Sequence, residues 1–259
     1  MNENIIEVRG LRKGFNGQTI LDGVDVSFPR GKITAILGKS GTGKSVLMKN
    51  LIGLFDPEEG EILIDGENIV VQGYDRKRQI RRRLGYLFQD AALFDSMTVE
   101  ENLAFPLVEV LHMRDKAAIR RRIEELLEWI QLPGIEQKLP DELSGGMRKR
   151  VGLARSLASE PEIMLFDEPT TGLDPLLSEN VHNLIERVNK ELGMTCIIIT
   201  HDIVGSFELA DSIAFLHEGK VLAQGSPEEM RNFKHPVLQK FLEFSFVCDD
   251  PALINGASQ

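Results

Sequence analysis

The chain has 259 residues, of which 42% are hydrophobic and 27% are charged, and its formal net charge at pH 7 is −10. This composition allows a packed core and does not predict disorder, and the length fits one large domain or a domain with a subdomain. The acidic balance argues against general binding to DNA or RNA, so we expect no nucleic-acid partner.

The sequence also argues against membrane insertion and export. No run approaches the roughly 18 consecutive apolar residues of a membrane-spanning helix. Residues 1–4 lack the basic and apolar regions of a signal peptide. Cys196 and Cys248 have no metal-ligand spacing and fit a reducing cytoplasm. We therefore expect a protein that is soluble by itself and is held by a partner at any membrane it serves.

Short apolar runs predict strands in the first ninety residues, at 5–8, 24–28, 33–37, 61–65 and 84–88. Phe15-Asn16-Gly17 predicts a turn between the first two of these strands. The third strand enters a glycine-rich segment, and the apolar-rich stretch after it, residues 46–54, predicts a helix.

The second half of the chain alternates between helical and strand patterns. Helices are predicted at 115–131, 147–158 and 178–192, the first from apolar residues that recur every three or four positions. Buried strands are predicted at 163–166 and 196–200, and a hairpin at 213–216 and 220–223. Strands that alternate with helices are typical of a largely parallel α/β sheet.

Two segments interrupt this alternation. Residues 91–160 are rich in helix and are interpreted as a subdomain, and a short helix followed by a tail is predicted from about residue 229. Three basic clusters, at 76–83, 120–122 and 148–150, are interpreted as solvated helix faces.

The most informative segment is residues 38–45, Gly-Lys-Ser-Gly-Thr-Gly-Lys-Ser, which fits the phosphate-loop pattern between a strand and a helix. Its glycines let backbone N–H groups cradle phosphate oxygens, and the helix N-terminus adds positive charge. Lys44 is placed to reach the β- and γ-phosphates, and Ser45 to bind Mg²⁺. We expect a nucleoside triphosphate here, contacted by Gly38, Lys39, Ser40, Gly41, Thr42, Gly43, Lys44, Ser45 and Val46.

Two carboxylates, Asp167 and Glu168, follow the buried strand 163–166. Ligands of open α/β sheets bind at the carboxyl ends of the strands. Asp167 fits a ligand of Mg²⁺, either direct or through water, and Glu168 fits a base that orients or activates the attacking water.

Three further features also lie at the ends of strands or helices. Gln89 is placed to reach the metal or the water, although a glutamine at the end of a strand is usually a plain surface residue. His201 is placed to hydrogen-bond a γ-phosphate, although a lone histidine is more often structural. Ser144-Gly145-Gly146 begins a helix, and the residues alone leave open a second anion-binding cap or an ordinary N-cap.

These motifs, in this order, resemble the nucleotide-binding subunits of ATP-binding-cassette (ABC) transporters, over about residues 5–228. The resemblance implies a RecA-like phosphate-loop α/β core of residues 5–90 and 161–228. It also implies an antiparallel β region, a helical signature subdomain at 91–160, and a C-terminal helix and tail at 229–259.

The resemblance also implies a role for each motif. Phe15 stacks on adenine, Gln89 senses the metal and faces the transmembrane partner, and His201 is the switch histidine. Residues 144–147, including Met147, are the signature that contacts ATP bound to the opposite subunit, and Asp174 links the two sites. Two copies are thus expected to close head to tail over two ATP molecules and to drive a membrane permease.

Met147, Lys39 and Val46 depart from the usual family pattern. Together with residues 92–107 they resemble the ATPases of Mla/Mce-type lipid transporters, with the permease against 92–107. The residues expected to line that contact, or to belong to the subdomain core, are Leu93, Phe94, Val99 and Phe105. The resemblance implies MCE-domain and small STAS-type proteins as further partners, and a place on the cytoplasmic face of the inner membrane.

Three alternatives compete with a lipid-transport ATPase. The first is the same subunit in a small-solute importer, such as one for amino acids. The second is a soluble cassette ATPase of translation or DNA repair, which would usually carry two cassettes, a long coiled coil or zinc-binding cysteines. The third is a phosphate-loop kinase, which would not need the 144–147 segment.

Overall fold

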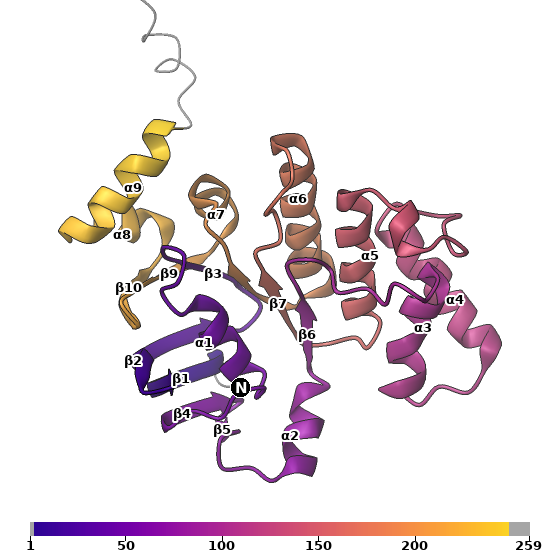
Figure 1. The fold of residues 1–259 in the computed structure, drawn as a ribbon, viewed down its shortest axis with the longest axis horizontal. Coiled ribbons are helices and arrows are strands. Elements are labelled where there is room, and N and C mark those ends of the chain that lie inside the picture. The colour runs from indigo at the N-terminus through magenta and orange to yellow at the C-terminus, as the bar shows by residue number, and fades with distance from the viewer. Residues whose placement is uncertain (1–2, 249–259) are drawn as a thin grey trace, which may run out of the picture.

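The computed structural model describes residues 3–248 and contains two β-sheets with helices packed around them (Figure 1). The smaller sheet is antiparallel, in the order β2-β1-β4-β5. Its strands are β1 (Asn4–Phe15), β2 (Gln18–Pro29), β4 (Glu59–Ile64) and β5 (Glu67–Asn68). This sheet is the antiparallel region that the resemblance implied.

The larger sheet has six strands in the order β10-β9-β3-β8-β7-β6. They are β3 (Ile33–Leu37), β6 (Leu84–Leu87), β7 (Ile163–Asp167), β8 (Thr195–Ile199), β9 (Ser212–His217) and β10 (Lys220–Gly225). All pairings are parallel except that of β9 with β10. The predicted parallel sheet is therefore confirmed, and the carboxyl ends of β3, β6, β7 and β8 meet at one edge.

The helices are α1 (Lys44–Leu51), α2 (Tyr74–Arg81), α3 (Val99–Glu109), α4 (Lys116–Trp129), α5 (Gly145–Leu157), α6 (Pro175–Leu192), α7 (Ile203–Leu209), α8 (Pro227–Asn232) and α9 (Pro236–Cys248). Helices α3, α4 and α5 lie together at one side of the molecule, and α8 and α9 lie at the other (Figure 1). Within residues 3–248, no helix is both long and apolar enough to span a bilayer.

Two hydrophobic cores lie on opposite faces of the larger sheet. The alternating side chains of β7 serve both, because successive residues of a strand point to opposite faces. Ile163 and Leu165 pack in the core beneath the antiparallel sheet and α1, whereas Met164 and Phe166 pack in the core shared with α3 to α6. Strand β7 therefore ties the two parts together and holds its carboxyl end rigidly.

The predicted elements differ from the structure mainly in their ends. The strand at 33–37 and the hairpin joining β9 to β10 are as predicted. Strands β1 and β2 are much longer than 5–8 and 24–28, because register shifts beside Gly10, whose φ is 57°, break the apolar alternation without ending the ladder. The short helix predicted from about residue 229 is two helices, α8 and α9, and the predicted tail at 249–259 lies outside the described residues.

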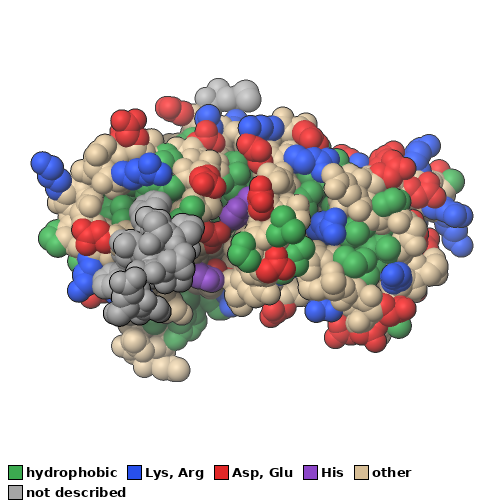
Figure 2. Space-filling model, turned by 90° about the horizontal axis from the view of Figure 1, so that it is seen from above, with side chains coloured by type: hydrophobic (Ala, Val, Ile, Leu, Met, Phe, Trp, Pro, Cys, Tyr) green, Lys and Arg blue, Asp and Glu red, His purple; other side chains and the backbone are tan. Residues whose placement is uncertain are grey.

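Charged side chains of both signs are interspersed over the face seen from above, and histidine side chains lie near its centre (Figure 2). Hydrophobic side chains gather on the same face towards the helical side (Figure 2). This face therefore combines a mixed-charge surface with apolar contact area.

Candidate functional site

The phosphate loop joins β3 to α1 at the carboxyl edge of the parallel sheet, and its glycines are required by its shape. A Cβ on Gly38 would lie 2.3 Å from the carbonyl oxygen of Leu216. Gly41 and Gly43 have φ angles of 80° and 103°, which side-chain-bearing residues rarely adopt. The loop can therefore turn its backbone inward ahead of the helix N-terminus, as an anion cradle does.

Lys44 is folded back onto this loop. Its Nζ donates hydrogen bonds to the carbonyl oxygens of Gly38, at 2.7 Å, and Lys39, at 3.1 Å. Burial lowers the pKa of Lys44, and the carboxylates of Glu168 and Asp167 oppose that shift. A phosphate oxygen arriving in the loop would supply an anionic partner for this buried ammonium group.

Ser45 and Asp167 lie together at the ends of α1 and β7. The Ser45 hydroxyl donates to Asp167 Oδ1 at 3.4 Å, and the Tyr86 hydroxyl donates to Asp167 Oδ2 at 2.7 Å. Burial and the hydrogen bond to Asp167 raise the pKa of Tyr86, so this phenol stays a donor that fixes the carboxylate.

The oxygen donors of Ser45 and Asp167 fit Mg²⁺, which binds proteins through one or two carboxylates together with substrate phosphates. Among residues 3–248, no group of three or more His, Cys, Asp or Glu side chains is placed to hold a metal ion by itself. A magnesium ion at this position would therefore need oxygen atoms from a nucleotide as well as from Ser45 and Asp167.

Glu168 is constrained from several directions. Its φ is 49°, a conformation that costs an L-residue roughly 1–2 kcal/mol. Its Oε2 accepts a hydrogen bond from the Thr171 hydroxyl at 3.1 Å and lies 2.7 Å from His201 Nδ1. The Glu168 side chain is only 17% exposed, whereas that of His201 is 65% exposed. The carboxylate is thus fixed, and the imidazole faces open space.

One cavity of about 750 Å³ brings most of the predicted nucleotide residues together. It is lined by Phe15, Ile20, Ser40, Gly41, Gly43, Lys44, Ser45, Val46, Gln89, Glu168, Thr171 and His201. Phe15 is 40% exposed at the outer end, where its ring packs edge-on against Phe55 with centroids 5.2 Å apart. The cavity thus has an aromatic end and a charged end, as a nucleoside triphosphate requires.

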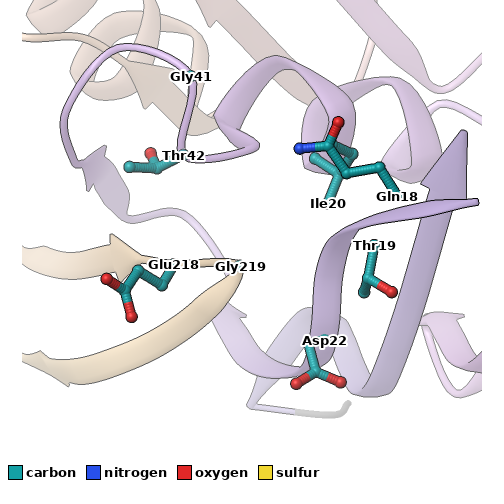
Figure 3. A pocket seen from close by; sticks show the side chains of 8 residues that line it. All are labelled: Gln18, Thr19, Ile20, Asp22, Gly41, Thr42, Glu218 and Gly219. Atoms are coloured by element: carbon teal, nitrogen blue, oxygen red, sulfur yellow. The ribbon is translucent and has the colours of Figure 1, made fainter.

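Thr42 belongs to a different hollow, of about 380 Å³, on the outer side of the loop (Figure 3). There Thr42 and Glu218 lie across from Gln18 and Thr19 of the β1–β2 hairpin (Figure 3). The Thr42 hydroxyl donates to the Lys39 carbonyl at 2.9 Å. Its side chain therefore shapes the loop and does not line the larger cavity.

The structure does not bring the 144–147 segment or Asp174 into the cavity. Ser144 caps α5 by accepting from the Met147 N–H at 3.3 Å, and Asp174 caps α6 by accepting from the Leu177 N–H at 2.9 Å. A Cβ on Gly145 would lie 4.0 Å from Leu173, and one on Gly146 3.5 Å from Leu177, which are ordinary contacts. The folded chain itself therefore does not require glycine at either position.

The predicted permease contact at 92–107 divides into surface and core. Phe94 and Phe105 are 41% and 40% exposed, and their rings lie 5.0 Å apart. Val99 is fully buried, and Leu93 packs against the same core, because both face the helices of the subdomain. Of the apolar residues named above, the two phenylalanines are therefore the surface pair.

The interpretation of residues 148–150 as a solvated helix face is wrong for Lys149. This side chain is buried, and its Nζ donates to the carbonyl oxygens of Pro169, at 2.8 Å, and Thr171, at 2.7 Å. Helix α5 has neighbours on more than one side, so its basic residues do not share one solvent face. In the cluster at 76–83, Arg83 is likewise held by Glu162 at 2.7 Å.

The sequence analysis also missed Tyr86 and Thr171, which hold the two carboxylates. Tyr86 lies within a predicted strand. Successive residues of a strand point to opposite faces, so Tyr86 could have been placed on the face opposite the buried Leu87. Thr171 follows the acidic pair by a few residues, and nothing in its neighbourhood distinguishes it in sequence.

A phosphate loop after β3, a carboxylate pair at the end of β7 and a largely parallel sheet flanked by a helical and an antiparallel part define a nucleoside triphosphatase of the phosphate-loop class. The family model of ABC transporters matches residues 21–171. The chain belongs to this family, as an ATP-binding subunit that hydrolyses ATP to drive transport.

Curated relatives cover nearly the whole chain. It is 42% identical to the probable ribonucleotide transport ATP-binding protein mkl of Mycobacterium leprae, over 92% of this chain and 68% of that protein. It is 38% identical to the intermembrane phospholipid transport system ATP-binding protein MlaF of Haemophilus influenzae, over 94% of this chain and 92% of that protein. The relatives therefore agree on an ATP-binding transport subunit and differ in cargo.

Solved structures agree with this assignment. CbiO1 from Clostridium perfringens, part of an ABC transporter complex, matches with a TM-score of 0.82 and 32% identity, over 93% of this chain and all of that one. The dimeric ATP-binding cassette MJ0796, bound to ADP and phosphate, matches with a TM-score of 0.77 and 30% identity, over 86% of this chain and 98% of that one.

Proposed function

We propose that this chain is the ATPase of a lipid transporter of the Mla/Mce type, held by a transmembrane permease at the cytoplasmic face of the inner membrane. The observation that carries the proposal is the 38% identity to MlaF over 92% of that protein's length. MCE-domain and small STAS-type proteins are the further subunits that such a transporter would include.

A second candidate is a ribonucleotide transporter. It is favoured by the 42% identity to mkl, although the chain spans 68% of that relative. Both candidates use the same ATPase chemistry, so they differ only in the cargo that the membrane partner carries.

In the proposed site, Phe15 stacks on the adenine, and Lys44 and the loop N–H groups bind the phosphates. Ser45 and Asp167 hold Mg²⁺ together with phosphate oxygens, and Mg²⁺ supplies charge neutralisation there. Gln89 lines the same cavity, where it is placed to sense the metal and the attacking water.

Glu168 is proposed as the base for that water, because its carboxylate is the one that lines the cavity beside Lys44. Its second contact, His201, is proposed to donate to the γ-phosphate. The hydrogen bond from the Thr171 hydroxyl and the closeness of His201 keep the carboxylate oriented before a nucleotide enters.

The segment Ser144, Gly145, Gly146 and Met147 and the cap Asp174 are proposed to act on the nucleotide of a second copy. The room at Gly145 supports this, because a Cβ there would meet only Leu173, at 4.0 Å, so the fold of this chain does not need glycine at that position. The likeness to a cassette whose structure is a dimer supports it as well.

The permease is proposed to contact the surface around Phe94 and Phe105. Asn102, which is fully buried, fixes this surface by donating to the carbonyl oxygens of Phe94, Met97 and Thr98. Arg155 lies 5.4 Å from the centre of the Phe94 ring and joins the surface to α5. A movement of this surface would therefore reach the signature helix directly.

The cargo is tested by purifying the chain with its membrane partners and reconstituting the complex in nanodiscs of defined lipid. A lipid transporter is expected to co-purify with phospholipid, to contain an MCE-domain subunit, and to hydrolyse ATP faster than the isolated chain. Stimulation by ribonucleotides in a complex without bound lipid would instead support the second candidate. Rapid hydrolysis that does not respond to any membrane partner would contradict both.

A further inference from the structure

Lys149 is a buried cation whose contacts are backbone carbonyls. It is the fifth residue of α5 and is 8% exposed. Its Nζ donates to Pro169 O at 2.8 Å and to Thr171 O at 2.7 Å. Burying an ammonium group is costly unless hydrogen bonds hold it, so two short bonds to one loop mark a specific role.

The loop that Lys149 grips connects the two residues on which the proposed chemistry depends. Residues 169–173 run from Glu168, the proposed base, to Asp174, the cap of α6. Within it the Thr171 N–H donates to Glu168 O at 3.2 Å, and the Leu173 N–H donates to Thr170 O at 3.1 Å. A shift of Thr171 would therefore move the backbone and the side chain of Glu168 together.

Glu168 needs such support. Its left-handed backbone is a conformation that persists only where surrounding contacts hold it. Its N–H donates to Ile199 O at 2.8 Å, which fixes the sheet side. Lys149 fixes the loop side, through its hydrogen bonds to the carbonyl oxygens of Pro169 and Thr171, one and three residues after Glu168.

The same helix carries the segment proposed to act on the second copy. Helix α5 begins just after Ser144, and its first turn lies beside Leu173, which precedes α6, and Leu177, which is in the first turn of α6. Lys149 therefore joins the helix that begins with the 144–147 segment to the loop of residues 169–173 in the same chain.

We propose that Lys149 is a positioning residue that locks the Glu168–Asp174 loop to the signature helix, so that movement of α5 is transmitted to the proposed base. This proposal rests on the proposed function of Glu168 and of the 144–147 segment. Lys149 does not touch the nucleotide cavity. Its loss should therefore lower kcat and leave nucleotide affinity intact.

The test compares ATP hydrolysis and ATP affinity in the purified full chain and three variants. Lys149→Met keeps the length and removes both donated hydrogen bonds, and kcat is expected to fall by about tenfold or more. The dissociation constant for ATP is expected to stay within about twofold, because Lys44 and the loop are untouched. Lys149→Arg, whose planar fork can donate to both carbonyls, is expected to restore most of kcat.

Arg150→Met is the matched control. Arg150 is the next residue of α5, is partly buried, and donates to a carbonyl oxygen, that of Ile130, at 3.3 Å. Its loss is expected to lower the melting temperature and to leave kcat near that of the wild type. A fall in kcat that merely follows stability would appear in both variants, whereas the proposed role predicts it for Lys149→Met alone.

Wild-type kcat in a folded Lys149→Met variant, or equal loss in Lys149→Met and Arg150→Met, would overturn the proposal. If Lys149→Met does not fold, Lys149→Gln decides. Its shorter amide reaches at most one carbonyl, so kcat should fall several-fold at unchanged affinity, and a wild-type kcat would overturn the proposal. A wild-type chain that neither binds nor hydrolyses ATP would instead contradict the proposed function itself.

Discussion

The cavity beside the phosphate loop and the edge formed by the starts of α5 and α6 are built in different ways. In the cavity, side chains from separate elements contact one another: Ser45 bonds Asp167, and Glu168 meets His201. At the other edge, Ser144 and Asp174 cap their own helices, and a Cβ on Gly145 would meet no atom closer than 4.0 Å. The cavity is held together by contacts within one chain, whereas the edge at α5 and α6 is the surface proposed to contact a second copy.

Under the proposed function, one copy would fold around the nucleotide cavity, and the residues at the other edge would act only on the nucleotide of a second copy. The side chains at the cavity are oriented by hydrogen bonds to one another, and such preorganisation is what catalysis needs. The edge at α5 and α6 contributes nothing to that cavity in the monomer. Each of the following changes acts on one region and should leave the other intact.

The largest effect is expected for Glu168→Gln. Loss of a positioned base costs about 10²–10⁴-fold in rate, and the amide still fits beside Thr171 and His201. ATP binding should therefore remain, and an ATP-bound dimer should accumulate, as measured by steady-state hydrolysis and size-exclusion chromatography. ATP hydrolysis by Glu168→Gln at the wild-type rate would contradict the proposed role of Glu168 as the base.

Lys44→Ala is expected to act on binding. Hydrogen bonds to charged groups contribute about 1.5–3 kcal/mol, so ATP affinity should fall by about 10–100-fold. A fluorescent ATP analogue measures this directly, with Lys190→Ala, at a side chain 70% exposed on α6, as the control. Unchanged affinity in Lys44→Ala would show that the cradle is elsewhere.

Gly145→Ala tests the other region. The added Cβ would lie 4.0 Å from its nearest neighbour, so the melting temperature and ATP affinity of the monomer should not change. Hydrolysis and ATP-dependent dimerisation should fall by about tenfold, because the methyl group obstructs the approach of the second copy. Loss of monomer stability would mean instead that the glycine serves the fold.

The smallest effect is expected for Phe55→Leu. Edge-on aromatic pairs contribute about 0.5–1.5 kcal/mol, so looser placement of Phe15 should weaken ATP binding by about two- to tenfold. Binding of tripolyphosphate, which has no base, should be unaffected. Leu54→Ala, at an exposed neighbouring position, is the control. Equal weakening for both ligands would argue against an adenine stack at Phe15.

The parts of the molecule that sequence could predict are those with a uniform local environment. The strand at 33–37 is buried along its whole length, so its apolar run gave its ends correctly. The phosphate loop is contiguous, and its required glycines are visible in the pattern. Strands β1 and β2 were shortened in the prediction because irregular register mixes polar and apolar positions.

The contacts that sequence could not predict join distant segments. Lys149 has basic neighbours on both sides in sequence, and only the packing of α5 against residues 169–171 separates it from them. Tyr86 and Phe55 similarly support Asp167 and Phe15 from other elements. The residues proposed to do chemistry were predicted from motifs, whereas the residues that contact and hold them could be identified only in the fold.

The central claim, that each ATP site is shared between two copies, is tested most directly by mixing two variants that are each impaired in hydrolysis. Glu168→Gln lacks the base of the cis region, and Gly145→Ala lacks the contact offered to the partner. A mixed dimer contains one site with an intact base and an intact signature, so hydrolysis should return when the two variants are combined. If the mixture hydrolyses ATP no faster than Gly145→Ala alone, the site is not shared and the account is contradicted.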